Sequence, residues 1–272
     1  MKTVLLILCT VATLAPAHEQ GFSFTSAPLQ FTPLAAHTFE PRVGVLWHTH
    51  GNWLRLDIGN SVDMVQYSYA DDRRRLSIGA DFFTYTLLRG EKNFHFPVDA
   101  VDYFFGFNSS YIDTMSEGVL SSRLRLSHIS AHFVDGHFDG PTGSWKDGLN
   151  PRVYSREFLE LTIAYEPNIT VRGYTGVFYL WHVDPTTLPR WIGYVGAEYH
   201  HPLTSVFSGY TAYQFTATGH RPRHEFQAGV KLGQWHGRGT KLFFLYYSGN
   251  SIHGEYHDRP EEYSGVGFNI DF

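Results

Sequence analysis

The sequence predicts an all-β fold in one domain, a transmembrane antiparallel β-barrel of about twelve strands. The last ten residues, 263–272, place Val266, Phe268 and Ile270 on one face of a strand and small or polar residues on the other. Most of the candidate strands reach the 9–11 residues that a tilted strand needs to cross hydrocarbon. No segment shows the 3.6-residue apolar stripe of an amphipathic helix, and no apolar run after residue 17 is long enough for a membrane-spanning helix.

The N-terminus predicts export. Lys2, an apolar run over residues 4–14 and the sequence Ala15-Pro16-Ala17 follow the order of a charged region, a hydrophobic region and a cleavage site. We therefore expect residues 1–17 to be a secretory signal peptide rather than a buried helix. The only cysteine, Cys9, lies in this segment, so the mature chain is expected to lack disulfides and cysteine chemistry.

The remaining chain divides into a lead-in and a barrel. Residues 18–42 are rich in Pro, Ser, Thr and Ala and are predicted to be a periplasmic N-terminal lead-in. Residues 43–272 are predicted to form the barrel, with long connections at one end and mostly short ones at the other. The expected strands are 43–49, 52–66, 73–88, 99–109, 118–133, 153–165, 169–182, 190–201, 207–218, 222–235, 240–249 and 262–272.

Composition narrows the function classes. Aromatic residues make up 17% of the chain, and barrel walls use such side chains where strands cross the membrane interfaces. The net charge of −5 gives no support for a nucleic-acid partner. A soluble exported β-sandwich, which alternates in the same way, is the alternative fold. The sequence does not determine the oligomeric state.

The C-terminal strand resembles the signal by which bacterial outer-membrane barrels are recognised for insertion. The residues that carry this resemblance are Tyr263, Gly265, Phe268, Ile270 and Phe272. It implies a location in the outer membrane of a Gram-negative bacterium. The implied partners are membrane lipid and, during biogenesis, the barrel assembly machinery.

Three motifs resemble a known family. They are LRLSHISAH over Leu124–His132, LYYSGN over Leu245–Asn250 and EYSGVG over Glu262–Gly267. The chain is similar in these motifs to the bacterial outer-membrane barrel family catalogued as domain of unknown function 1207. This resemblance implies a barrel fold and an outer-membrane location, but no activity.

One polar constellation predicts chemistry. His128 and Ser130 share the parity of Leu124 and Leu126, and residue 128 is expected near residue 158 of the next strand, where Glu157 faces lipid. A serine with an imidazole and an orienting carboxylate is the arrangement of nucleophilic catalysis. It resembles the lipid-facing sites of outer-membrane phospholipase A and lipid A 3-O-deacylase, although Ala131 replaces the Asn of the deacylase-like motif. The alternative interpretation is a polar membrane rim without catalysis.

A second set of polar residues is expected to face the lumen. Their mixed signs predict a satisfied network that fills the lumen or a narrow channel for small solutes. None of the histidine pairs has the spacing of a metal site, so we expect neither a metal nor another cofactor. The predicted lumen-facing residues are Asp81, Asp102, Arg123, Arg125, Glu160, Glu198, Glu225 and Lys231.

Overall fold

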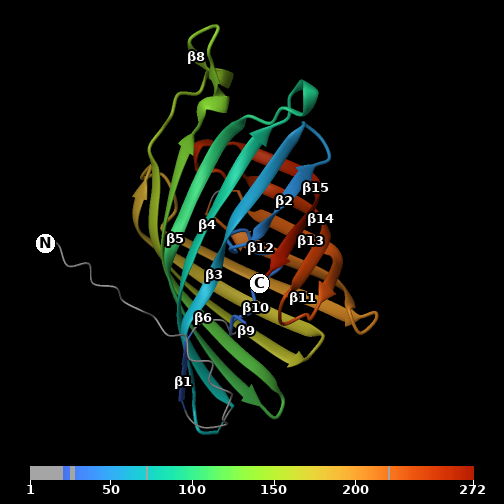
Figure 1. Ribbon diagram of the computed structural model, residues 1–272. Coiled ribbons are helices and arrows are strands. Elements are labelled where there is room, and N and C mark those ends of the chain that lie inside the picture. Colours follow the sequence, from blue (N-terminus) through green and yellow to red (C-terminus); the bar gives the residue numbers. More distant parts are fainter. Residues whose placement is uncertain (1–20, 25–27, 72, 220) are drawn as a thin grey trace, which may run out of the picture.

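The computed structural model of the chain is an antiparallel β-barrel in which strands that follow one another in the sequence lie side by side (Figure 1). It describes residues 21–24, 28–71, 73–219 and 221–272, so the predicted signal peptide lies outside the described part. The strands of the wall are β2 (Val43–His48), β3 (Trp53–Ser68), β4 (Arg74–Arg89), β5 (Val98–Met115), β6 (Gly118–Phe133), β9 (Tyr154–Asn168), β10 (Val171–Asp184), β11 (Trp191–Pro202), β12 (Phe207–Ala217), β13 (Arg223–Gly233), β14 (Gly239–Asn250) and β15 (Pro260–Asp271).

The wall closes because β15 pairs with β2, which pairs with β3. The predicted twelve-stranded barrel is thus confirmed, and β5 continues to Met115, past its predicted end at residue 109. No helix among the described residues is long and apolar enough to cross a membrane. The small elements are β1 (Gly21–Phe24), which pairs with the end of β3, the hairpin β7 (Phe138–Asp139) and β8 (Ser144–Trp145), and the 3-10 turns η1 (Lys92–Phe94), η2 (Asp135–His137), η3 (Lys146–Gly148) and η4 (Gly254–Tyr256).

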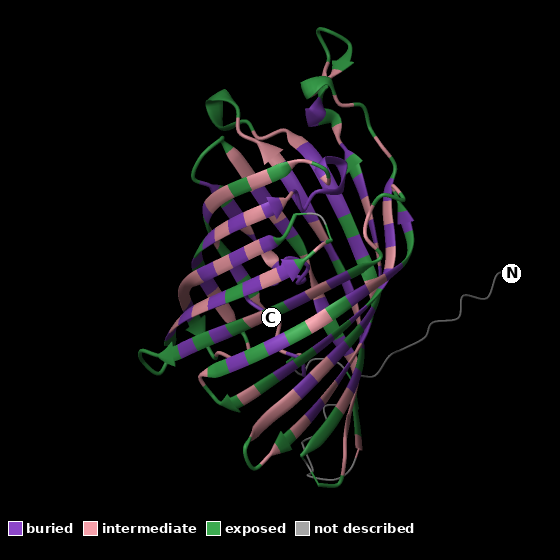
Figure 2. Cartoon of the chain, turned by 180° about the vertical axis from the view of Figure 1, so that it is seen from behind, coloured by how far each residue is buried: buried purple, intermediate pink, exposed green. Residues whose placement is uncertain are grey.

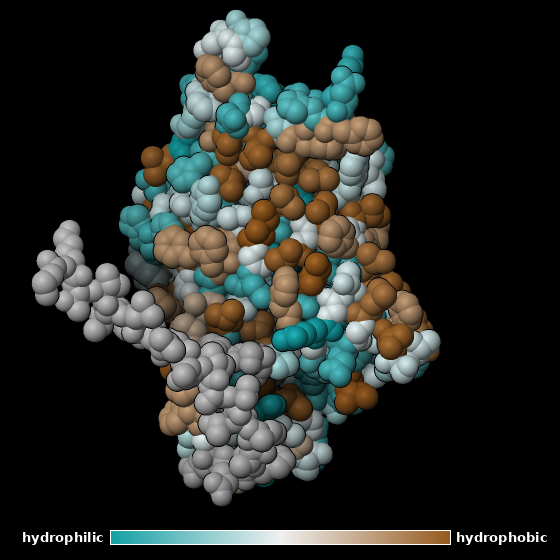
Figure 3. Space-filling view, viewed as in Figure 1, coloured by the Kyte–Doolittle hydropathy of each residue, from teal (hydrophilic) through white to brown (hydrophobic). Residues whose placement is uncertain are grey.

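Exposed and buried residues alternate along the strands, as the two faces of a barrel wall require (Figure 2). The exposed face is apolar, and hydrophobic side chains gather on it below the polar loops at the top of the view (Figure 3). Exposing so many large apolar side chains to water would be unfavourable, whereas a wall that faces lipid requires them. Among them are Ile78, Phe82, Phe105, Phe107, Leu124, Leu126, Leu159, Leu161, Ile163, Val266 and Phe268.

Two long connections lie at the same end of the barrel, which we call the long-loop end. Arg152 Nη1 of the β6–β9 connection lies 2.9 Å from Asp258 Oδ2 of the β14–β15 connection. The hydrogen bond from Arg152 lowers the pKa of Asp258 from 3.8 to about 2. Because this pKa is depressed, the ion pair contributes fully above pH 3.8 and is lost only as the pH falls through about 2.

The lumen is occupied by residues 29–42, which we call the inner segment. We expected residues 18–42 to be a periplasmic lead-in, and for the inner segment the structure corrects this expectation. Phe31, Leu34 and Phe39 are almost completely buried in one core cluster with wall residues such as Phe104 and Phe158. The segment enters the lumen because twelve strands enclose more space than their own side chains fill.

Buried charges fix the inner segment in place. Glu40 lies 2.6 Å from Arg123 Nη2 and 2.8 Å from Arg125 Nη2, and all three side chains are buried. Arg125 also lies 3.1 Å from Asp81 and 3.2 Å from Glu160, on either side of its own strand. A charge buried in this way is tolerated only when it is paired and hydrogen-bonded. Arg123 and Arg125 therefore depend in part on a segment that follows no strand pattern.

Replacing Glu40 with glutamine tests this role. The change keeps the side-chain shape but leaves the buried guanidinium groups of Arg123 and Arg125 without their shared partner, at a cost of about 3–5 kcal/mol. We expect the inner segment to leave the lumen in a measurable fraction of molecules. Planar-bilayer recordings should therefore show channel openings for Glu40→Gln.

The matched control is Glu91→Gln, because Glu91 is an exposed carboxylate that pairs with His95 and Lys146 near η1. Its recordings should match those of the wild-type protein, without large openings. A large and steady conductance of the wild-type barrel would contradict a lumen filled by the inner segment.

Candidate functional site

The site begins with an ion pair on the outer wall. His128 of β6 and Glu157 of β9 are register partners, and His128 Nδ1 lies 2.8 Å from Glu157 Oε1. Both side chains are partly exposed on the lipid-facing parity of their strands. The sequence placed residue 128 opposite residue 158, so the observed register differs by one residue. Because Glu157 itself is the partner, the structure brings the predicted histidine and carboxylate into contact.

Ser130 lies two residues beyond His128 on the same face of β6, opposite Ser155 of β9. Within the part of the chain that the structure describes, no hydrogen bond joins Ser130 to the ring of His128. Such catalytic hydrogen bonds are often long before substrate binds. If His128 donates its Nδ1 proton to Glu157, its Nε2 lone pair is left free to accept the proton of a hydroxyl.

Neighbouring side chains complete the site, and the sequence argument did not identify them. The ring of Phe105 lies 4.8 Å from that of His128, and Tyr103 is the register partner of Ser130. Nδ1 of His182 in β10 donates a second hydrogen bond to Glu157. A register shift between Leu180 and His182 aims this histidine at Glu157, and the sequence carries no signal for that shift.

The depth of the site explains how the wall tolerates a carboxylate. Ser130 lies three residues from the end of β6, and Glu157 lies three residues from the start of β9. At about 3.3 Å per residue the site is roughly 10 Å from the ends of these strands. A charge on the lipid face costs about 2–4 kcal/mol at the membrane midplane but only about 0–1 kcal/mol near the interface. Glu157 is in addition paired with both His128 and His182, so its charge is not left alone on the wall.

The expected lumen-facing residues are all buried inside the barrel. Glu198 accepts a hydrogen bond from the Ala35 amide and Glu225 one from Thr38, both in the inner segment. Other pairs in this network join neighbouring strands, such as Arg125 with Glu160 and Glu198 with Arg172. The eight residues are Asp81, Asp102, Arg123, Arg125, Glu160, Glu198, Glu225 and Lys231.

The residues of the predicted insertion signal divide between the two faces of β15. Phe268 and Ile270 are exposed on the outer wall, and Phe272, which follows the strand, is exposed as well. Tyr263 and Gly265 lie on the inward parity. The recognition of these residues during insertion stays a prediction. In the described ranges no group of three or more His, Cys, Asp or Glu residues could hold a metal ion.

Comparison with protein families gives one match, which covers nearly two thirds of the chain. The family described as protein of unknown function (DUF1207) matches residues 99–272. The chain belongs to this family. No curated protein matches the chain.

Two similar solved structures carry the same architecture. Outer membrane phospholipase A from Escherichia coli has a TM-score of 0.54 at 10% identity, over 88% of this chain and 92% of that chain. An active-site mutant of the same Escherichia coli protein has a TM-score of 0.55 at 10% identity, over 90% of this chain and 93% of that chain. At this identity the likeness shows the fold alone, which is that of bacterial outer-membrane barrels.

Single-cysteine labelling tests where the site faces. The mature chain is expected to lack cysteine, so Ser130→Cys and Ser127→Cys each introduce a single thiol. The two thiols lie on opposite faces of β6. A nitroxide label at residue 130, in protein embedded in bilayers, should collide more often with oxygen dissolved in lipid than with a water-soluble nickel chelate. The label at residue 127 should be shielded from both, because Ser127 is buried. Equal accessibility at the two positions would contradict the assigned facing.

Proposed function

We propose that the protein is an outer-membrane lipid ester hydrolase whose site lies on the outer wall of the barrel. The observation that carries this proposal is the contact of His128 with Glu157, with Ser130 on the same exposed row. A histidine, a serine and a carboxylate on a lipid-facing surface have few structural uses, because each exposes polar atoms to hydrocarbon. Their shared chemical use is acyl transfer.

Each residue has a distinct role in the proposed reaction. Ser130 Oγ attacks the ester carbonyl while His128 Nε2 takes the hydroxyl proton, and His128 returns that proton to the departing alcohol. Water then releases the fatty acid from Ser130 by the same proton transfers in reverse order. Glu157 holds the ring orientation and stabilises the protonated imidazole. Tyr103, opposite Ser130, is the side chain best placed to donate a hydrogen bond to the developing oxyanion.

The position of the site favours a lipid substrate. In one direction along β6 from His128, the exposed Leu126 and Leu124 form an apolar surface on which an acyl chain can lie. In the other direction the strand reaches the loops, where a polar headgroup meets water. We also propose that the predicted signal peptide directs export of the protein and that the mature barrel resides in the outer membrane. The name phospholipase A on a similar barrel supports the choice of substrate class. A channel function is less favoured, since the inner segment fills the lumen.

Loss of the nucleophile is the direct test. Ser130→Ala should lower the rate of fatty acid release from phospholipid in mixed micelles about a thousandfold or more, because no other hydroxyl occupies its place. Glu157→Gln should cause a smaller loss, since the amide can still orient His128 but no longer stabilises its charge. Free fatty acid is measured by titration or mass spectrometry.

Ser155→Ala is the matched control, because Ser155 lies directly opposite Ser130 on the same face. This variant should keep wild-type hydrolysis. Hydrolysis that survives in Ser130→Ala, or that is absent from the folded wild-type protein, would refute the proposed activity.

A further inference from the structure

The strand β2 is much shorter than its neighbours, and this leaves a gap in the wall. It pairs with β15 only from Val43–Ile270 to His48–Gly265, and with β3 only from Gly44 to Trp47. In the described structure the part of β15 that begins at Pro260 and ends at Tyr263 has no strand partner on this edge. One further hydrogen bond, from Thr49 N to Ser264 O, closes the pairing. The wall is therefore interrupted near the long-loop end.

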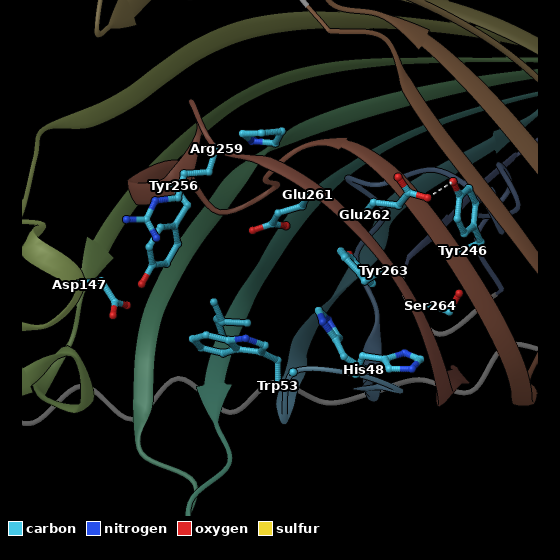
Figure 4. Close-up of a pocket in the computed structure, with 14 residues that line it drawn as sticks. His48, Trp53, Asp147, Tyr246, Tyr256, Arg259, Glu261, Glu262, Tyr263 and Ser264 are labelled. Carbon is cyan, nitrogen blue, oxygen red and sulfur yellow. Dashed lines mark hydrogen bonds between the residues drawn. The ribbon is translucent and has the colours of Figure 1, made fainter.

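A cavity of about 650 Å³ lies at this interruption (Figure 4). Small-molecule sites commonly occupy about 300–1,000 Å³. Glu261 and Tyr263 belong to the inward parity of β15, whereas Glu262 and Ser264 belong to the outward parity, so the cavity opens through the wall. We call it the wall window. Its lining also includes His48, His50, Gly51, Trp53, Leu87, Asp147, Tyr246, Tyr256, Arg259 and Pro260.

The lining excludes several ligand classes. Three carboxylates against one arginine disfavour an anion such as phosphate, and an acyl chain would strip water from those carboxylates. A simple cation would compete with Arg259 of the lining and with Arg89, which lies outside the lining but contacts two of its residues. Arg89 lies 4.6 Å from the ring of Trp53 and pairs with Asp147, and Arg259 lies 4.9 Å from the ring of Tyr256.

A neutral polyhydroxylated ligand fits the same lining. Each sugar hydroxyl both donates and accepts hydrogen bonds, and the wall window offers carboxylate acceptors beside arginine and imidazole donors. The hydroxyls of Tyr246 and Tyr256 already donate to Glu262 and Asp99. Aromatic rings present a negative face to the C–H groups of a sugar ring. Trp53 and Glu261 border the same open space in Figure 4. We propose that the wall window binds a short saccharide from the exterior side of the membrane.

This binding site is independent of the proposed hydrolase site. Its lining residues come from β2, β3, β4, β14, β15 and the loops beside them, and β5 lies between β4 and the strand that carries Ser130. The saccharide can come from the headgroup of a surface glycolipid or from free sugar in the medium, because the window opens both to the wall and to the loops. The shared chemistry is the sugar ring itself.

Binding by the purified full-length barrel in nanodiscs tests the proposal. The probes are maltotriose, cellobiose and diacetylchitobiose, and rough-type lipopolysaccharide incorporated into the nanodiscs, with tryptophan fluorescence and calorimetry as readouts. At least one probe should bind. Trp53→Ala and the more conservative Glu261→Gln should each weaken its binding about 10- to 100-fold, the effect of losing a contact to a charged group or a ring.

Trp191→Ala is the matched control, because Trp191 is an exposed tryptophan near the long-loop end of β11, outside the window. Its affinity should equal that of the wild-type protein, and unboiled gel migration verifies that each variant is folded. Tighter binding of lipopolysaccharide than of the free sugars supports a glycolipid source, whereas equal or tighter binding of a free sugar supports a soluble source. Binding of no probe, or binding that both window variants leave unchanged, overturns the proposal.

Discussion

The structure depends on the pairing of Glu40 with Arg123 and Arg125 inside the barrel. Two guanidinium groups held out of water need a carboxylate within hydrogen-bond distance. The strands supply Asp81 and Glu160 to Arg125, and the carboxylate that Arg125 shares with Arg123 is Glu40. The inner segment brings this shared carboxylate, and its phenylalanines belong to the buried core cluster. Phe31 lies between Arg123 and Arg172, so even the apolar contacts of the segment involve the same charges.

A filled lumen changes where function can lie. The inner segment and the paired charges fill the interior of the barrel. Surfaces open to ligands remain at the outer wall and at the interruption beside β2. On an apolar wall, a polar residue is conspicuous because it must find a partner or lie near the interface. His128 and Glu157 satisfy both conditions, since they bind each other and lie close to the long-loop end. The same physical rule that makes the wall apolar thus makes the candidate site recognisable.

The sequence predicts the wall well and the interior poorly, and the reason is periodicity. Alternation between two faces is a strong local signal, so the facing of Leu126, Arg125 and Phe268 follows from parity alone. The inner segment has no repeating pattern, and its prolines and alanines resemble those of a linker. Its contacts with Glu198 and Glu225 join residues more than a hundred positions apart, which local patterns cannot reveal. Likewise, the contact of His182 with Glu157 depends on a register shift.

The central claim is that Ser130 is a nucleophile activated by His128 on the outer wall. Covalent trapping with a long-chain alkyl sulfonyl fluoride in detergent micelles tests it most directly, because the reagent marks the attacking oxygen. Peptide mass spectrometry should find the sulfonyl group on Ser130 of the wild-type protein. His128→Asn should remain unmodified, since the hydroxyl then has no base. No modification at Ser130, or equal modification in His128→Asn, would contradict the account.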